Sequence, residues 1–403
     1  MGWREWVGLK PRVEDFAALL ISQIAREGSL GWTFDRSDST LRHPEGGVIN
    51  LVNIYLEYCG GARSIRSALL EKYVTMSMVN ARPVPTLWEV AAKSIYPTVR
   101  SRFDHMVPSI ESRITQEAMP VRLSTPWIGD LEVRIVYDWG AHMTVVSAEL
   151  AETWGQTLES ILERALVNLA ALPKPAWESI ARGVYELRTE TSYQESLLLV
   201  DKVIDQLPFS RTAVCIACNR GVLLAADADD SESLIELFEQ AIESLRQKPW
   251  PLSATALQRR PDGWQEYHPQ GEAAVRARNL HTVSLAGIYA DQKQALESLH
   301  SKTQTDIFVA TVGLFRRSQD GNAIRSWCAW GESFASLLPK TDLIAFARAG
   351  NNGDDRAMMV RWEHVVSIVG HHMRATSEDP ARYFVDATFN DSEWAQLTAA
   401  KEG

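Results

Sequence analysis

The sequence has few cysteines and none of the common catalytic signatures. Its 403 residues contain four cysteines, too few to stabilise a chain of this size by disulfide bonds, so we expect a reducing, cytoplasmic compartment. The motifs H-E-x-x-H, G-x-S-x-G, G-x-x-x-x-G-K-[ST] and G-x-G-x-x-G do not occur. This absence removes the commonest signals of metalloproteases, serine hydrolases, phosphate-binding loops and dinucleotide-binding folds. We therefore predict no catalytic residue, no cofactor and no metal site.

Long apolar runs and basic stretches are lacking as well. The longest apolar run near the N-terminus, residues 16–21, is far shorter than a membrane span, and we expect neither a signal peptide nor a transmembrane helix. With 41 basic and 51 acidic residues the net charge is -10, and no dense Lys/Arg run offers a nucleic-acid surface. Trp3 and Trp6 leave open a peripheral contact with a membrane surface.

Hydrophobic residues make up 45% of the chain, enough to bury a sizeable core over two or three domains. Apolar periodicity predicts helices at 13–26, 62–78, 87–103 and 156–171, and a hairpin from 131–137 and 142–148. We expect a mostly helical N-terminal region with a small hairpin at 1–115. An α+β module at 116–270 and a further module at 276–403 follow.

In the second half of the chain, several residues or residue pairs recur about 130 positions later, and we call these recurring residues landmarks. The pairs are Gly183 and Gly313, Leu207-Pro208 and Leu338-Pro339, Thr212 and Thr341, Pro249 and Pro380, and Trp264 and Trp394. Landmarks in the same order predict an internal duplication, with a first copy at about 176–268 and a second at 276–403. The predicted fold class is α+β, with mainly antiparallel sheets and packed helices, the second half being built from two similar modules.

Cys215 and Cys218 form a C-x-x-C spacing that can bind zinc or support redox chemistry. Residues three apart on a strand point to opposite faces of the sheet, so the two thiols should diverge. Structural zinc also needs four ligands, and no second pair of suitable spacing occurs. We predict that both cysteines are buried packing residues.

Two turns at equivalent places in the proposed copies carry polar side chains. The candidate interaction residues on them are Asn219, Arg220, Asn351, Asn352 and Arg356. If the copies pair about a pseudo-twofold axis, these turns line one groove that binds another protein or a small ligand; otherwise they are ordinary solvated turns. The sequence thus favours a non-catalytic cytoplasmic binding or interaction protein.

The alternative is a metal-dependent hydrolase or transferase that uses scattered carboxylates. Its candidate residues are Asp227, Asp229, Asp354 and Asp355. For Asp229, a role as N-cap of the helix that follows fits better than a calcium loop. His364, His371 and His372 are interpreted as surface histidines, because His364 and His371 lie about 10.5 Å apart along a helix.

Four diffuse hydrophobic patterns resemble the YtpQ-like family of bacterial proteins of unknown function. They lie at 130–138, 148–155, 165–169 and 212–217. The resemblance covers about residues 10–260 and implies a soluble bacterial cytoplasmic protein of mixed α and β structure. It implies no active-site residues for this chain. The chain departs from the family in its additional C-terminal module and in the cysteines on the strand at 212–217.

Overall fold

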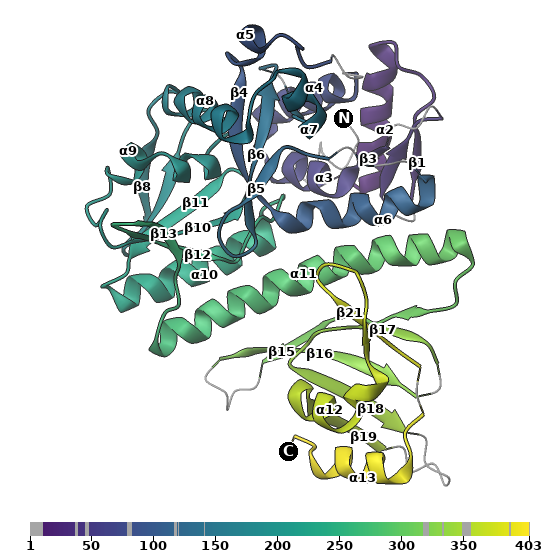
Figure 1. Ribbon diagram of the computed structural model, residues 1–403. Coiled ribbons are helices and arrows are strands. Elements are labelled where there is room, and N and C mark those ends of the chain that lie inside the picture. Colours follow the sequence, from purple (N-terminus) through teal and green to yellow (C-terminus); the bar gives the residue numbers. More distant parts are fainter. Residues whose placement is uncertain are drawn as a thin grey trace.

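The computed structural model describes residues 11–36, 39–44, 48–78, 83–116, 119, 121–140, 142–316, 322–332, 334–348, 356–386 and 388–402. It shows an α+β fold in which helices pack on several separate sheets (Figure 1). Among the described strands, parallel pairing occurs between β14 (Phe308–Val309) and β17 (Ser336–Pro339) and between β16 (Ile324–Gly331) and β18 (Leu343–Arg348). All other pairs of these strands are antiparallel, so the predicted fold class is confirmed.

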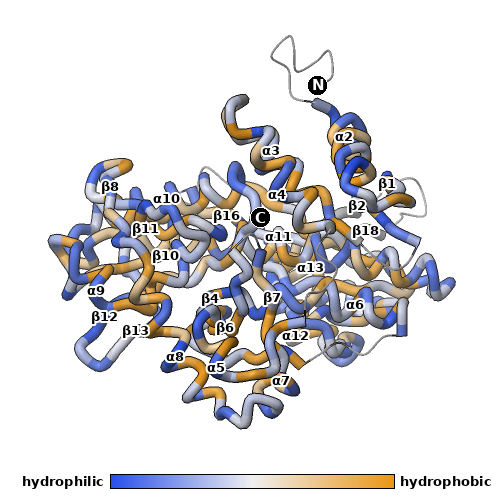
Figure 2. The backbone as a smooth tube through the Cα atoms, turned by 90° about the horizontal axis from the view of Figure 1, so that it is seen from above, coloured by the Kyte–Doolittle hydropathy of each residue, from blue (hydrophilic) through white to orange (hydrophobic). Residues whose placement is uncertain are grey.

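The N-terminal module is a small sheet covered by three helices. Its elements are α2 (Val13–Arg26), β1 (Thr33–Asp35), β2 (Thr40–Arg42), β3 (Val48–Asn50), α3 (Leu51–Gly60) and α4 (Arg66–Met78). The predicted helix at 13–26 is confirmed, and its apolar stripe buries Phe16, Leu20 and Ile24. Figure 2 shows hydrophobic and hydrophilic residues alternating along α2, as an amphipathic helix requires.

The next module is a sheet built around β6 (Leu131–Asp138). Its strands also include β4 (Ile95–Ser101), β5 (Ser124–Pro126) and β7 (Met143–Val145), and its helices are α5 (Trp88–Ala91), α6 (Met106–Thr115), α7 (Ala148–Thr153) and α8 (Leu158–Ala170). The predicted hairpin and the helix at 156–171 are confirmed. The predicted helix at 87–103 is wrong beyond α5, because residues 95–101 pair with β6 along their whole length and Pro97 disfavours a helix. One sheet thus includes strands from both sides of the predicted boundary at 115.

The third module is a six-stranded antiparallel sheet in the order β13-β12-β10-β11-β9-β8. Its elements are β8 (Ala176–Ala181), β9 (Val184–Arg188), η3 (Glu195–Leu199), α9 (Asp201–Ile204), β10 (Ala213–Asn219), β11 (Val222–Asp227), α10 (Ser231–Gln247), β12 (Ala256–Arg260) and β13 (Gly263–Glu266). Helix α10 packs on one face. The other face shares a core with Val99 of β4 and Leu131 of β6. The second and third modules are therefore joined by common packing.

Helix α11 (Gly271–Thr303) is the longest described helix, and it runs between the modules (Figure 1). The C-terminal module follows with β15 (Gly313–Arg316), β19 (Arg356–Arg361), α12 (Trp362–Val369), η5 (Gly370–His372), β20 (Arg374–Ala375), β21 (Arg382–Val385) and α13 (Asp391–Ala399) beside the strands named above. No helix within the described ranges combines the length and apolar composition that a membrane crossing requires.

The predicted internal duplication is not confirmed. The first segment forms one six-stranded sheet, whereas the second forms two four-stranded sheets in the orders β15-β16-β18-β19 and β14-β17-β21-β20. Landmarks that match in sequence differ in structure: Leu207-Pro208 follows helix α9, whereas Leu338-Pro339 ends strand β17. What the two segments share is an antiparallel hairpin followed by a helix, β10-β11-α10 and β18-β19-α12.

Candidate functional site

The C-x-x-C cysteines are packing residues, as predicted. Cys215 and Cys218 are free and fully buried, and they belong to the cores on opposite faces of the β10 sheet. Burial raises the pKa of both thiols, that of Cys218 to about 11. Because the two thiols lie in cores on opposite faces of the sheet, they do not converge on one zinc ion, and a protonated thiol does not attack a disulfide.

The two candidate residues on the β10–β11 turn have different environments. Asn219 is fully buried, and its amide donates to the carbonyl oxygens of Lys248 and Pro249. It holds the end of α10 against the turn. Arg220 has a side chain 39% exposed, which stacks over the ring of Trp250 at 5.2 Å. Of these two candidates, Arg220 is therefore the one that reaches solvent.

The remaining sequence candidates contribute little to a described site. Asn351, Asn352, Asp354 and Asp355 lie outside the described residues, as do Trp3 and Trp6, and Arg356 opens β19 with its side chain outside the description. Asp227 accepts hydrogen bonds from the Thr212 hydroxyl at 2.6 Å and from the Asp229 amide at 3.1 Å, so it closes a turn. The N-cap of α10 is Asp230, one residue after the predicted Asp229.

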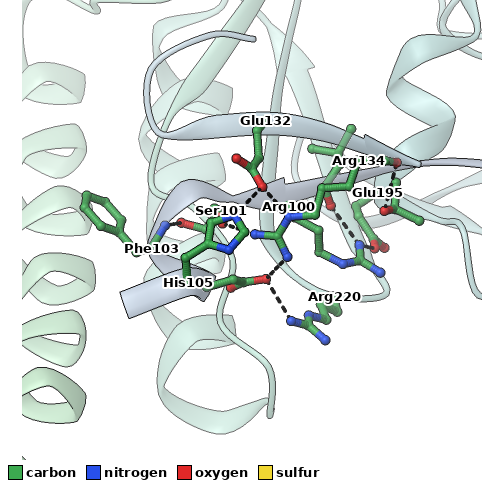
Figure 3. A network of polar contacts seen from close by, with 11 residues as sticks. Arg100, Ser101, Phe103, His105, Glu132, Arg134, Glu195 and Arg220 are labelled. Atoms are coloured by element: carbon green, nitrogen blue, oxygen red, sulfur yellow. Dashed lines mark hydrogen bonds and ion pairs between the residues drawn. The ribbon is translucent and has the colours of Figure 1, made fainter. Parts of the chain in front are cut away.

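The structure instead brings charged residues from distant segments into one network, at the junction of the second and third modules (Figure 3). At its centre, the buried Arg134 pairs with Glu132, two residues earlier on β6. Arg134 Nη2 also donates to the Ser101 carbonyl oxygen at 2.8 Å. His105 Nε2 lies 3.0 Å from Oε1 of the same Glu132. Burial alone raises the pKa of Glu132, but the hydrogen bonds from His105 and Arg134 outweigh it and hold that pKa below its usual range.

Asp104 connects this centre to the β10–β11 turn. Its Oδ2 lies 3.3 Å from Nη1 of Arg134 and 2.9 Å from Nη2 of Arg220. One carboxylate oxygen thus serves two arginines. Figure 3 shows the guanidinium groups of Arg134 and Arg220 approaching each other around this contact.

A second pair lies beside the first. Glu195, 1% exposed, forms an ion pair with Arg100 of β4, and its Oε2 accepts a hydrogen bond of 2.9 Å from the Gly221 amide. Arg100 Nη1 also donates to the carbonyl oxygen of Val99 at 2.7 Å. Glu195 thus connects the turn that carries Arg220 to strand β4, and this connection fixes the position of Arg220.

Arg122 is the unusual member of this neighbourhood. It lies just before β5 and is half-buried, yet its side chain has no hydrogen bond or ion pair with any described residue. Burial and the positive charges of Arg134 and Arg220 lower the pKa of Arg122, whereas Asp104 and Glu132 oppose that shift. A half-buried guanidinium without a counterion is unfavourable. The site therefore has four arginines and three carboxylates, an excess of one positive charge.

Sequence reasoning identified one residue of this network, Arg220. The other arginines, at 100, 122 and 134, lie on separate strands or their approaches, without a basic run or a motif spacing. The sequence contains one indication of the network, in strand β6. There the charged residues Glu132 and Arg134 alternate with apolar residues, although the strand is buried on both faces. Buried charges within a strand indicate a specific polar network.

Elsewhere in the described chain, His371, His372 and Glu393 bring three potential metal-ligand atoms within 4.8 Å of one another.

Comparison with known proteins finds no matching family model, no matching curated protein and no matching solved structure. The resemblance to the YtpQ-like family stays a prediction.

Proposed function

We propose that this chain is a non-catalytic cytoplasmic binding protein, and that its ligand presents an oxyanion, a carboxylate or a phosphate, to Arg122 and Arg220. The observation that carries the proposal is the unpaired state of the half-buried Arg122 beside two other arginines. An anion there would supply the counterion that the described residues do not provide.

The geometry suits a small anionic group. Guanidinium groups donate paired N–H bonds that match the oxygens of carboxylates and phosphates. Arg220 and His105, with side chains 39% and 33% exposed, open the network to solvent, while Arg134 and Glu195 behind them are buried. The ion pair with Asp104 holds Arg220 in place before the ligand arrives, which lowers the entropic cost of binding.

The overall charge limits the kind of ligand. The chain carries a net charge of -10, so a long polyanion would meet repulsion outside this local positive excess. A small metabolite with one acidic group, or a single acidic side chain of another protein, avoids that repulsion. The four free, buried cysteines support the cytoplasmic location, because the described chain holds no disulfide among them.

A thermal-shift panel tests the proposal and separates the ligand sources. Wild-type protein is heated with inorganic phosphate, pyrophosphate, citrate, or a short Glu-containing peptide, against chloride at matched ionic strength. An anion that binds only the folded state raises the melting temperature, and the rise grows with the logarithm of its concentration once this exceeds the dissociation constant. A rise with phosphate or citrate indicates a small ligand, and a rise with the peptide alone indicates a protein partner. Equal melting temperatures in all the solutions would overturn the proposal.

A further inference from the structure

A second site lies in the C-terminal module, away from the arginine network. Here η5, which follows helix α12, meets the first turn of α13. His372 Nε2 lies 3.0 Å from Glu393 Oε1, and His371 Nε2 lies 3.2 Å from the same oxygen. The two imidazole rings have centroids 4.0 Å apart. Two adjacent histidines and a carboxylate from a segment about 20 residues later therefore aim at one point.

We propose that His371, His372 and Glu393 form a zinc-binding site. Imidazole nitrogen and carboxylate oxygen are ligands that zinc prefers, with bonds of about 2.1 Å. Tetrahedral ligand atoms around such an ion lie about 3.4 Å apart. The observed separations of 3.0 and 3.2 Å need only a small outward movement to admit the ion.

The carboxylate is already oriented for this role. Glu393 closes a capping box at the start of α13, in which its Oε2 accepts a hydrogen bond of 2.9 Å from the Asn390 amide. Oε1 is thereby turned toward the two histidines. The ring of His372 also packs beside Phe389, with centroids 6.2 Å apart. Such outer contacts fix ligand orientation in metal sites and raise their affinity.

The site is open on one side. The side chain of His371 is 62% exposed, whereas those of His372 and Glu393 are 27% and 12% exposed. Three protein ligands leave at least one tetrahedral position, which water can fill from the exposed side. Magnesium and calcium prefer sets of oxygen ligands, so they should not compete for a site with two imidazoles.

The test is a zinc titration of metal-free protein without a polyhistidine tag, in competition with a chromophoric chelator. Wild-type protein should bind one equivalent of zinc. His371→Ala should weaken binding at least tenfold, and so should Glu393→Gln, whose amide oxygen can still accept from the Asn390 amide. His364→Ala is the matched control, because this exposed histidine of α12 lies outside the group and its loss should leave binding unchanged.

Two further readouts bear on the ligands themselves. X-ray absorption at the zinc edge should show two imidazole nitrogens in the first shell, and affinity should fall at acidic pH because bound imidazoles must be neutral. Since His371 is exposed, its substitution should not unfold the protein. Absence of saturable zinc binding to the wild type would overturn the proposal, and so would unchanged affinity in the His371→Ala and His372→Ala double variant.

Discussion

Asp104 and Arg220 are 116 residues apart in the sequence, yet Arg220 Nη2 donates a hydrogen bond of 2.9 Å to Asp104 Oδ2. The contact joins the turn after β4 to the β10–β11 turn, and thus two sheets. Arg134 lies 3.3 Å from the same oxygen. Asp104 therefore pairs directly with two arginines at once and acts on Arg122 only through its charge, without a hydrogen bond or ion pair.

This sharing leads to an unusual prediction for Asp104→Asn. Loss of the carboxylate should lower the free energy of unfolding by about 1–2 kcal/mol, because two arginines lose a charged partner. The same change should raise the affinity for an oxyanion several-fold, because the local positive excess grows. Calorimetric titration and urea denaturation measure the two effects on one variant. If the variant loses both stability and anion affinity, Asp104 is only a structural residue and the electrostatic account of the site is wrong.

Arg122 and Arg134 should respond in opposite ways to the same substitution. Arg122→Gln removes a half-buried charge that has no hydrogen-bond or ion-pair partner, so stability should stay within about 0.5 kcal/mol of wild type or increase. Arg134→Gln leaves the buried Glu132 without its main partner, which should cost about 3 kcal/mol or more. Urea unfolding curves of the two variants make the comparison. A large loss in Arg122→Gln would mean that this guanidinium has a structural role.

Glu132 should make stability depend on acidic pH. Its pKa in the folded protein lies below the ordinary value of 4.5, so its ion pair stabilises the fold above that pH. The contribution disappears as the pH falls through the lowered pKa. Glu132→Gln should thus be less stable than wild type at pH 7, and the gap should narrow below about pH 4.5. Glu152→Gln, an exposed residue of α7, is the control and should show no gap. A gap that is constant with pH would contradict the assignment.

The cysteines should be inert in the folded protein. Because Cys215 and Cys218 are fully buried and their thiols have raised pKa values, a thiol-reactive dye should label neither until denaturant is added. Cys218→Ala should also leave zinc affinity unchanged, since the proposed zinc ligands are elsewhere. Rapid labelling of the native protein, or loss of zinc binding in this variant, would restore the redox or metal interpretation.

How far the sequence predicts the structure depends on the range of the interactions. Helix α2 and the β6–β7 hairpin could be predicted because their apolar spacing is local. Strand β4 could not, since its pairing with β6, some 35 residues later, overrides a helix-like pattern. The duplication was inferred from landmarks that share spacing but not strand order.

The sites were harder to predict than the fold, for the same reason. Arg220 was identified because it lies on a polar turn. Its role in the proposed anion site depends on Asp104 and Arg122, which come near it only through tertiary packing. His371 and His372 were interpreted as surface histidines because His364 is too far from His371 along a helix, and Glu393, which lies beyond two intervening strands, was not considered. Spacing along the chain carries no information on such contacts.

The central claim is that Arg122 binds an oxyanion, and its most direct test is calorimetric titration of wild type, Arg122→Gln and Arg26→Gln with the anion that gives the largest thermal shift. Arg26 is the control because it is an exposed arginine at the end of α2, outside the network. The account predicts saturable binding to wild type and Arg26→Gln, and at least tenfold weaker binding, about 1.4 kcal/mol, to Arg122→Gln. Equal affinity in all three proteins would contradict it.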